Sequence, residues 1–90
     1  MLEPYEIKLP YKQKIILEAL QDEYATGAYT RELLDNCEAV KDFSMPQLTW
    51  ALNELYKSSL VVKQKGVYKG KEYTKYAVSD FVAYGGVKVK

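Results

Sequence analysis

The segment from Ser44 to Val62, SMPQLTWALNELYKSSLVV, constrains the fold of this 90-residue chain more than any other stretch. Ser44 and Gln47 have the spacing of a capping box, and Pro46 is tolerated in a first helical turn, which needs no intrahelical donors. Apolar residues then recur at i, i+3, i+4 and i+7, which places them on one face of a helix: Leu48, Ala51, Leu52 and Leu55. The spacing predicts a helix over 44–58 that buries this face and leads directly into a strand.

The opposite face of the predicted helix combines hydrogen-bonding groups, one cation and a large aromatic ring. It carries Pro46, Trp50, Asn53 and Lys57, flanked by Gln47, Thr49 and Glu54. Such a face suits a partner molecule better than the protein's own core. A single Trp on a helix surface is also typical of a core or dimer-interface position, so both interpretations stay open for Trp50.

The order of helix, small residues, hydrophobic pair and Lys-rich strand resembles the recognition helix and wing of winged helix-turn-helix regulators, and MarR-type repressors are the nearest pattern. The residues that carry the resemblance are Leu52, Leu55, Ser58-Ser59 and Leu60-Val61. It covers about residues 12–79. Two departures are visible: the family often has Gly at the position of Ser59, and the link from Leu33-Leu34 to Ser44 is a few residues longer than usual.

This resemblance implies an α+β fold with three helices and a C-terminal β-hairpin wing, in which strand-like extensions over 1–11 and 80–90 flank the core. It also implies a sequence-specific regulator of transcription that binds duplex DNA and acts as a repressor, with helix 44–58 in the major groove and wing 60–78 on the backbone. In its size this chain also resembles the compact regulators that viruses and plasmids encode. A homodimer is also expected, because one short recognition helix reads few base pairs and two-fold pairing doubles the site.

The resemblance also implies a role for each candidate DNA-binding residue by its position. Four residues of the helix are expected to contact DNA bases or adjacent phosphates: Gln47, Thr49, Trp50 and Asn53. The Asn53 amide has the chemistry to pair with adenine through two hydrogen bonds. Ser44 and Lys57 are expected to contact the DNA backbone, with Pro46 beside them. Lys69 and Lys71 are expected to reach phosphates or the minor groove of the DNA.

N-terminal to this segment, apolar and charged residues alternate over 5–9, which predicts a short strand that ends at Pro10. A broad apolar face predicts a buried helix over 11–24. Ala28-Tyr29 reads as a short strand, and Thr30 as the N-cap of a second helix over 31–37. The turn to the third helix is expected over 38–43, with Val40 and Phe43 as apolar anchors.

C-terminal to the third helix, two strands are predicted over 60–65 and 71–78. They flank the loop 66–70, whose two Gly residues permit positive φ. The tail 81–90 reads as two strand-like tetrads joined at Gly85-Gly86, which suits a two-residue hairpin turn. This tail is expected to pair with the first strand or with another chain.

Charge is distributed unevenly along the chain, although the net charge is only +1. Residues 1–60 hold six basic and ten acidic side chains, whereas residues 61–90 hold seven Lys against Glu72 and Asp80. Five of these Lys follow the predicted hairpin together with Tyr68 and Tyr73: Lys63, Lys65, Lys69, Lys71 and Lys75. Ammonium groups at this density can neutralise phosphates. Exposed strands also use Lys to prevent edge pairing, and this alternative stays open.

Catalytic, metal and cofactor chemistry find little support in the sequence. The chain has no His, and its five Gly do not have the spacing of a phosphate-binding loop. Cys37, near Leu33-Leu34, is interpreted as a small buried hydrophobe. Three carboxylates, Asp35, Glu38 and Asp42, do not have the spacing of a calcium loop and are expected to be solvated. We therefore expect no enzyme, no metal, no cofactor and no small-molecule substrate.

A hydrophobic content of 48% is enough for one domain, and a single Cys excludes an intramolecular disulfide. No apolar run approaches the length of a membrane span, and the first residues do not resemble a signal peptide. These features predict a cytoplasmic protein without membrane partners, in the host cytoplasm for a viral protein. The alternative function is a winged-helix module for protein–protein interaction without DNA binding, which the acidic first sixty residues would suit.

Overall fold

The computed structural model describes residues 5–83 and 87–89. Within these residues the helical elements are α1 (Tyr11–Glu23), α2 (Thr30–Asn36), the 3₁₀ turn η1 (Glu38–Val40), α3 (Met45–Lys57) and α4 (Asp80–Ala83). The strands are β1 (Tyr5–Ile7), β2 (Ala28–Tyr29), β3 (Val61–Tyr68), β4 (Lys71–Val78) and β5 (Val87–Val89). The described part of the chain is thus an α+β domain, as the sequence predicts.

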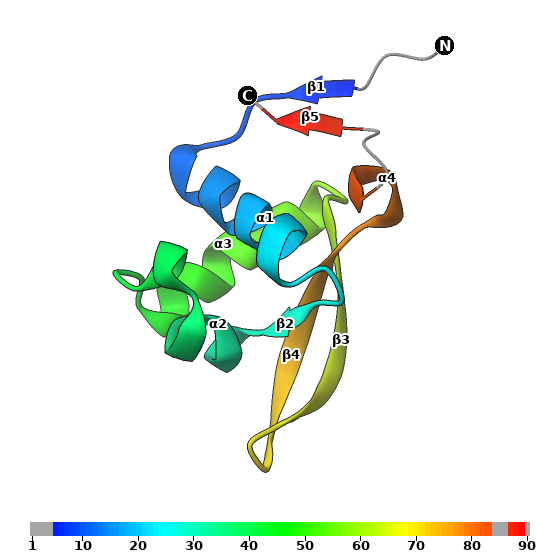
Figure 1. Cartoon of the computed structure of the whole chain (residues 1–90). Helices are drawn as coiled ribbons and strands as arrows, with labels where there is room; N and C mark the ends of the chain where they lie inside the picture. The colour runs from blue at the N-terminus through cyan, green and yellow to red at the C-terminus, as the bar shows by residue number, and fades with distance from the viewer. Residues whose placement is uncertain (1–4, 84–86, 90) are drawn as a thin grey trace.

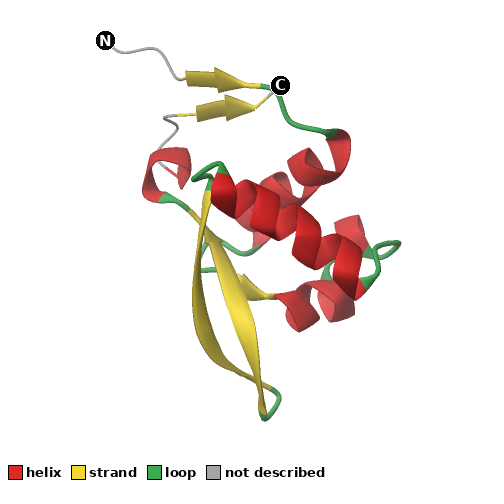
Figure 2. Ribbon diagram, turned by 180° about the vertical axis from the view of Figure 1, so that it is seen from behind, coloured by secondary structure: helices red, strands yellow, loops and turns green. Residues whose placement is uncertain are grey.

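The strands form two separate sheets. Strands β2, β4 and β3 form an antiparallel sheet in this order, in which β3 and β4 are the two arms of a long hairpin. Strands β1 and β5 form a parallel pair at the opposite end of the molecule from the hairpin tip (Figures 1 and 2). Helices α1, α2 and α3 lie between these two ends. This arrangement is compatible with a winged helix.

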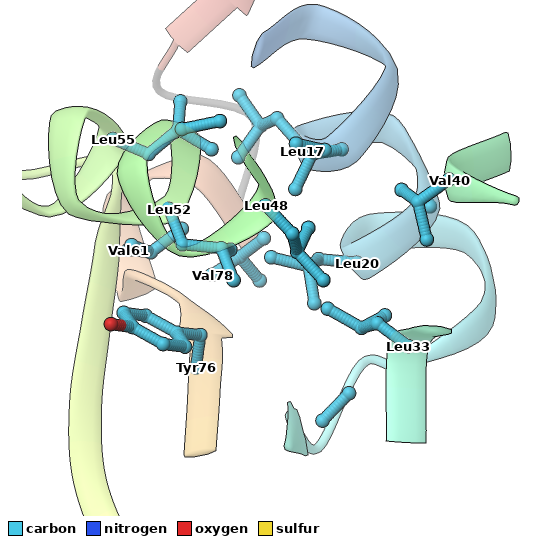
Figure 3. Close-up of a cluster of buried hydrophobic side chains, with 14 of the residues drawn as sticks. Leu17, Leu20, Leu33, Val40, Leu48, Leu52, Leu55, Val61, Tyr76 and Val78 are labelled. Atoms are coloured by element: carbon cyan, nitrogen blue, oxygen red, sulfur yellow. The ribbon is translucent and has the colours of Figure 1, made fainter. Parts of the chain in front are cut away.

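The core lies where α1, α2 and α3 meet the base of the hairpin (Figure 3). Leucines from the three helices are fully buried there: Leu17, Leu20, Leu33, Leu48, Leu52 and Leu55. Val61 and Tyr76 close the core from the hairpin, and Val82 extends it into α4. Cys37 is buried and free, as the sequence predicts, and the anchors behave as expected because Val40 is buried and Phe43 packs against the core.

Helix α3 begins and ends with backbone groups satisfied by specific partners. The Gln47 amide donates to Ser44 Oγ (3.2 Å) and the Ser44 amide donates to Gln47 Oε1 (2.9 Å), which confirms the predicted capping box. At the other end Ser59 has a positive φ of 62°. The Ser59 amide donates to the Tyr56 carbonyl and the Leu60 amide to the Leu55 carbonyl, which is the pattern of a Schellman motif.

The start of α2 differs from the prediction by one residue. Thr30 is the first helical residue and is buried, so its predicted role as N-cap is wrong. Tyr29 precedes the helix instead, and its amide donates to Glu32 Oε1 (3.2 Å). The side chain at N3 therefore satisfies the first backbone donor without a polar residue at the N-cap.

The predicted five-residue wing loop is also wrong. Strand β3 continues through Tyr68, and only Lys69 and Gly70 form the turn, both with positive φ (51° and 80°), as a type I′ hairpin turn requires. Gly66 instead lies within β3 opposite Tyr73. A Cβ at Gly66 would overlap the ring and hydroxyl of Tyr29, so this glycine provides room for an aromatic side chain from β2.

The first half of the tail does not form the predicted strand. Phe81 lies in α4 rather than in a strand, and Val82 is buried in the core, which accounts for the helical turn at this point. Strand β5 pairs with β1 in parallel, so one of the two expected partners of the tail is confirmed. The predicted turn at Gly85-Gly86 lies outside the described residues. None of the helices in the described part of the chain has the length and apolar character needed to cross a membrane.

Candidate nucleic-acid interface

Helix α3 presents one continuous face to solvent. Pro46, Gln47, Trp50 and Lys57 are exposed, and Thr49 and Asn53 are half-buried at the edge of this face, as is Glu54. The capping residue Ser44 is exposed next to them. All seven candidate residues from this segment therefore lie on or beside one surface, because the opposite stripe of the helix is fixed in the core.

Asn53 is held by a contact that the sequence alone does not indicate. Its Oδ1 accepts a hydrogen bond from the Tyr76 hydroxyl of β4 (3.1 Å). Tyr76 is 2% exposed, and burial raises the pKa of its hydroxyl above the ordinary value of 10.0, so this group is a neutral donor at physiological pH. The bond orients the Asn53 side chain and leaves its Nδ2 group as a donor toward solvent.

Trp50 is 61% exposed and borders a hollow of about 310 Å³ between the first turns of α1 and α3. The hollow is lined by Lys12, Phe43, Pro46, Gln47, Trp50 and Ala51. The Lys12 ammonium lies over the Phe43 ring, 5.7 Å from its centroid. Trp50 is therefore not a core residue, and its ring is available to a partner.

The C-terminal half of α3 is linked to the hairpin by an aromatic contact. The Lys63 ammonium lies 4.4 Å from the centroid of the Tyr56 ring, at the base of β3. Lys57 lies 3.7 Å from Glu54 in an ion pair within the helix, in which Lys57 is exposed and Glu54 is half-buried. A pair with one exposed partner on a helix surface contributes little to stability, so Lys57 can leave Glu54 and bind a phosphate instead.

The register of the hairpin divides the wing lysines between two faces. Residues paired across the strands share a face, and successive residues alternate. Lys63 pairs with Tyr76 and Lys65 with Thr74, so both point to the face on which Tyr76 contacts α3. Lys71 and Lys75 are out of phase with them and lie on the other face, as do Tyr68, Tyr73 and Tyr29.

The candidate wing residues are therefore not a single cluster. Lys65 lies 3.9 Å from Glu72, and Lys69 at the turn lies 3.6 Å from Asp35 of α2. Lys71 has no ion-pair partner among the described residues. The structure thus brings Lys63 to α3 through the Tyr56 ring and places Lys65 on the same face of the hairpin, nearer the tip. Lys69 and Lys71 lie at the tip beside α2.

Two groups of surface residues escape prediction from sequence. Lys12 and Phe43 join the α3 surface through the hollow beside Trp50, and Arg31 and Asn36 join the wing tip from α2. Lys12, Arg31 and Asn36 have no sequence signal beyond residue type, because the residues that they meet are distant in the chain, whereas Phe43 is expected from the sequence only as an apolar anchor. Within the described residues, no group of three or more His, Cys, Asp or Glu side chains is placed to hold a metal ion.

Comparisons with protein families, with curated proteins and with solved structures find no match for this chain.

Proposed function

We propose that this protein is a winged helix-turn-helix repressor that binds duplex DNA sequence-specifically, with α3 in the major groove. In this assignment α2 and α3 form the helix-turn-helix and β3–β4 form the wing. The observation that carries the proposal is that α3 meets the Lys63 and Lys65 side of the hairpin through the Asn53–Tyr76 hydrogen bond and through the contact of Lys63 with the Tyr56 ring. A helix that reads base edges beside strands that neutralise phosphates is a common way of binding DNA.

The proposed contacts divide into three groups. Gln47, Thr49, Trp50 and Asn53 contact bases or adjacent phosphates, and Ser44 and Lys57 contact the backbone beside Pro46. Lys63 and Lys65 neutralise phosphates next to the α3 site, and Lys69 and Lys71 do so at the wing tip. We also propose a homodimer, because strands β1 and β5 pair only with each other within the described residues and each leaves a free edge.

A titration of the full chain against mixed genomic DNA fragments, followed by fluorescence anisotropy at several salt concentrations, tests this function. Micromolar or tighter binding that weakens as salt rises is the expected result. Absence of binding up to roughly 0.1 mM, which is weaker than ordinary non-specific affinity, would contradict DNA binding.

A second candidate function is protein–protein interaction without DNA. The observation in its favour is the hollow beside Trp50, whose lining is mostly apolar and whose Trp ring is largely exposed. Exposed aromatic residues beside an apolar hollow are typical of docking surfaces for proteins. The anisotropy titration separates the two functions, because this alternative predicts no binding to any of the DNA fragments.

A further inference from the structure

A second hollow, of about 580 Å³, lies between α2 and the wing tip. Three cations and one carboxylate line it: Arg31, Lys69, Lys71 and Asp35. The neighbouring carboxylates on the same elements are engaged elsewhere, because Glu32 accepts a hydrogen bond from the Tyr29 amide and Glu72 lies 3.9 Å from Lys65. The side chains that line this hollow therefore carry a net charge of about +2 at neutral pH.

Asp35 already occupies part of this hollow in the way that an anionic ligand would. Its Oδ1 lies 3.1 Å from Arg31 Nε and its Oδ2 lies 3.6 Å from Lys69 Nζ. Two cations that hold the two oxygens of a carboxylate can hold two oxygens of a phosphate, since both anions match the same donors. Lys71 supplies a further cation that has no ion-pair partner among the described residues.

The wall of the hollow is fixed by aromatic packing. The Asn36 side-chain amide donates to the Tyr68 hydroxyl (3.4 Å), and the Tyr68 ring stacks on Tyr29 with centroids 5.7 Å apart. Gly66 provides the room that Tyr29 needs. These contacts hold the wing tip beside α2, so the cations from the two elements face one space before any ligand binds.

We propose that this hollow, the α2–wing cradle, binds a phosphate group through Arg31, Lys69 and Lys71. The phosphate displaces the Asp35 carboxylate, which pairs with Arg31 and Lys69 when no ligand is bound. A backbone phosphate of duplex DNA and a free phosphorylated small molecule share this chemistry. The first source rests on the function proposed above, whereas the second does not.

The test is an NMR titration of the ¹⁵N-labelled full chain with inorganic phosphate, and separately with a short duplex of arbitrary sequence, each at constant ionic strength. Phosphate is expected to shift the Arg31 Nε–H, the Asn36 side-chain amide and the backbone amides of 31–36 and 68–71. Asp35→Asn removes the competing carboxylate and should tighten phosphate binding about fivefold, the effect of one unit charge at about 4 Å in water. Lys71→Gln should weaken it.

Asp22→Asn is the matched control, because it removes one exposed carboxylate from α1 and changes the net charge equally. Tightening by Asp35→Asn without tightening by Asp22→Asn supports the cradle. Equal effects of the two variants, or no shift in these segments up to tens of millimolar phosphate, overturn it. A duplex that shifts the same signals identifies the DNA backbone as the source, whereas a duplex that shifts only α3 assigns the cradle to a free phosphorylated molecule. A duplex that does not bind at all contradicts the proposed function but leaves the phosphate result standing.

Discussion

Ser59, the second residue after α3, lies in the left-handed region with φ at 62°, where a residue with a side chain is strained and Gly is not. Replacement by Gly removes an αL cost of about 1–2 kcal/mol and adds back about 0.5–1 kcal/mol of chain entropy. We therefore expect Ser59→Gly to raise the free energy of unfolding by about 0.5–1 kcal/mol. Urea denaturation monitored by circular dichroism measures this change.

The adjacent serine provides the control for this prediction. Ser58 has an ordinary φ of −85°, so Ser58→Gly relieves no strain and should lower stability slightly. If both glycine variants lowered stability, the left-handed conformation of Ser59 would not be a source of strain.

Asn53 has two roles that substitution can separate. If it reads a base edge, Asn53→Ala should cost roughly 1–3 kcal/mol on a specific duplex and almost nothing on random DNA. The same substitution removes the bond from Tyr76, so the free energy of unfolding should also fall by about 1 kcal/mol. Anisotropy titrations with both duplexes, combined with urea denaturation, measure the two effects.

Tyr76→Phe is the matched control, because it removes the same hydrogen bond and leaves the Asn53 amide in place. We expect it to lower stability to a similar extent while specific binding is retained. Loss of specificity with Tyr76→Phe equal to that with Asn53→Ala would mean that the bond, and not the amide, is what DNA binding requires.

The Asn53–Tyr76 pair also illustrates what residue-level prediction can reach. Helical spacing places Asn53 on the outer face of α3, and strand alternation places Tyr76 on the core side of β4, and both positions follow from local periodicity. The hydrogen bond between them joins residues 23 apart in sequence. It depends on how the hairpin crosses the helix, which neither pattern specifies.

At the scale of elements, α1 and α3 could be predicted nearly to the residue because their signals are local: an apolar stripe and, for α3, a capping box. The prediction of the wing loop is wrong because Gly66 looks like a turn residue in sequence. Its actual role is to accommodate Tyr29, a residue 37 positions earlier on another strand. Because the turn is shorter than predicted, the pairing of β3 with β4 also differs from the predicted one. This pairing decides which lysines lie on the α3 side of the hairpin, and composition alone does not specify it.

The division of the hairpin into two faces gives a prediction for the wing. Replacing Lys63 and Lys65 together by Ala should weaken binding to specific and random duplexes alike, because phosphates carry no sequence information. The slope of log affinity against log salt should fall by about one for each phosphate that the protein no longer neutralises. Titrations of both duplexes at three or more salt concentrations measure the slope.

A control with the same change in charge replaces Lys14 of α1 and Lys75 on the other face of β4 by Ala. We expect this variant to leave the salt slope nearly unchanged, since the Lys75 ammonium lies over the Tyr29 ring on the other face of the hairpin and Lys14 lies on α1, outside the proposed contacts. Equal slopes for both double variants and the unmodified protein would mean that the α3 side of the wing does not lie on phosphate. In that case the phosphate contacts would have to come from α3 itself or from the wing tip.

At the scale of the whole molecule, the structure is elongated, with principal extents of 46 × 23 × 21 Å. The hairpin tip and the β1–β5 pair lie at its two ends (Figure 1). The sequence indicates the strand character of both chain ends, but not the helical turn of α4 between β4 and β5. Val82 is apolar in a run of apolar residues, and only the position of the core beside it decides between helix and strand.

The free edges of the β1–β5 pair lead to a prediction about assembly. A two-stranded sheet is marginally stable alone, and each strand exposes unpaired backbone groups on its outer side. We expect a homodimer through Tyr5–Tyr11, residues 81–90 and α1, so light scattering at tens of micromolar should give twice the chain mass of 10.4 kDa. Tyr11, which is 75% exposed at the start of α1, should contribute to this interface.

Tyr11→Ser is therefore expected to lower the mass toward that of a monomer at the same concentration, because it removes a large apolar surface from the interface. Tyr56→Ser is the matched control, since Tyr56 is a partly exposed tyrosine on α3, where its ring contacts Lys63. This control should leave the dimer intact. A monomeric mass for the unmodified protein, unchanged by added duplex, would exclude the dimer. A dimer predicts a palindromic DNA site, because such a site reflects the two-fold symmetry of the protein, and a monomer would not require one.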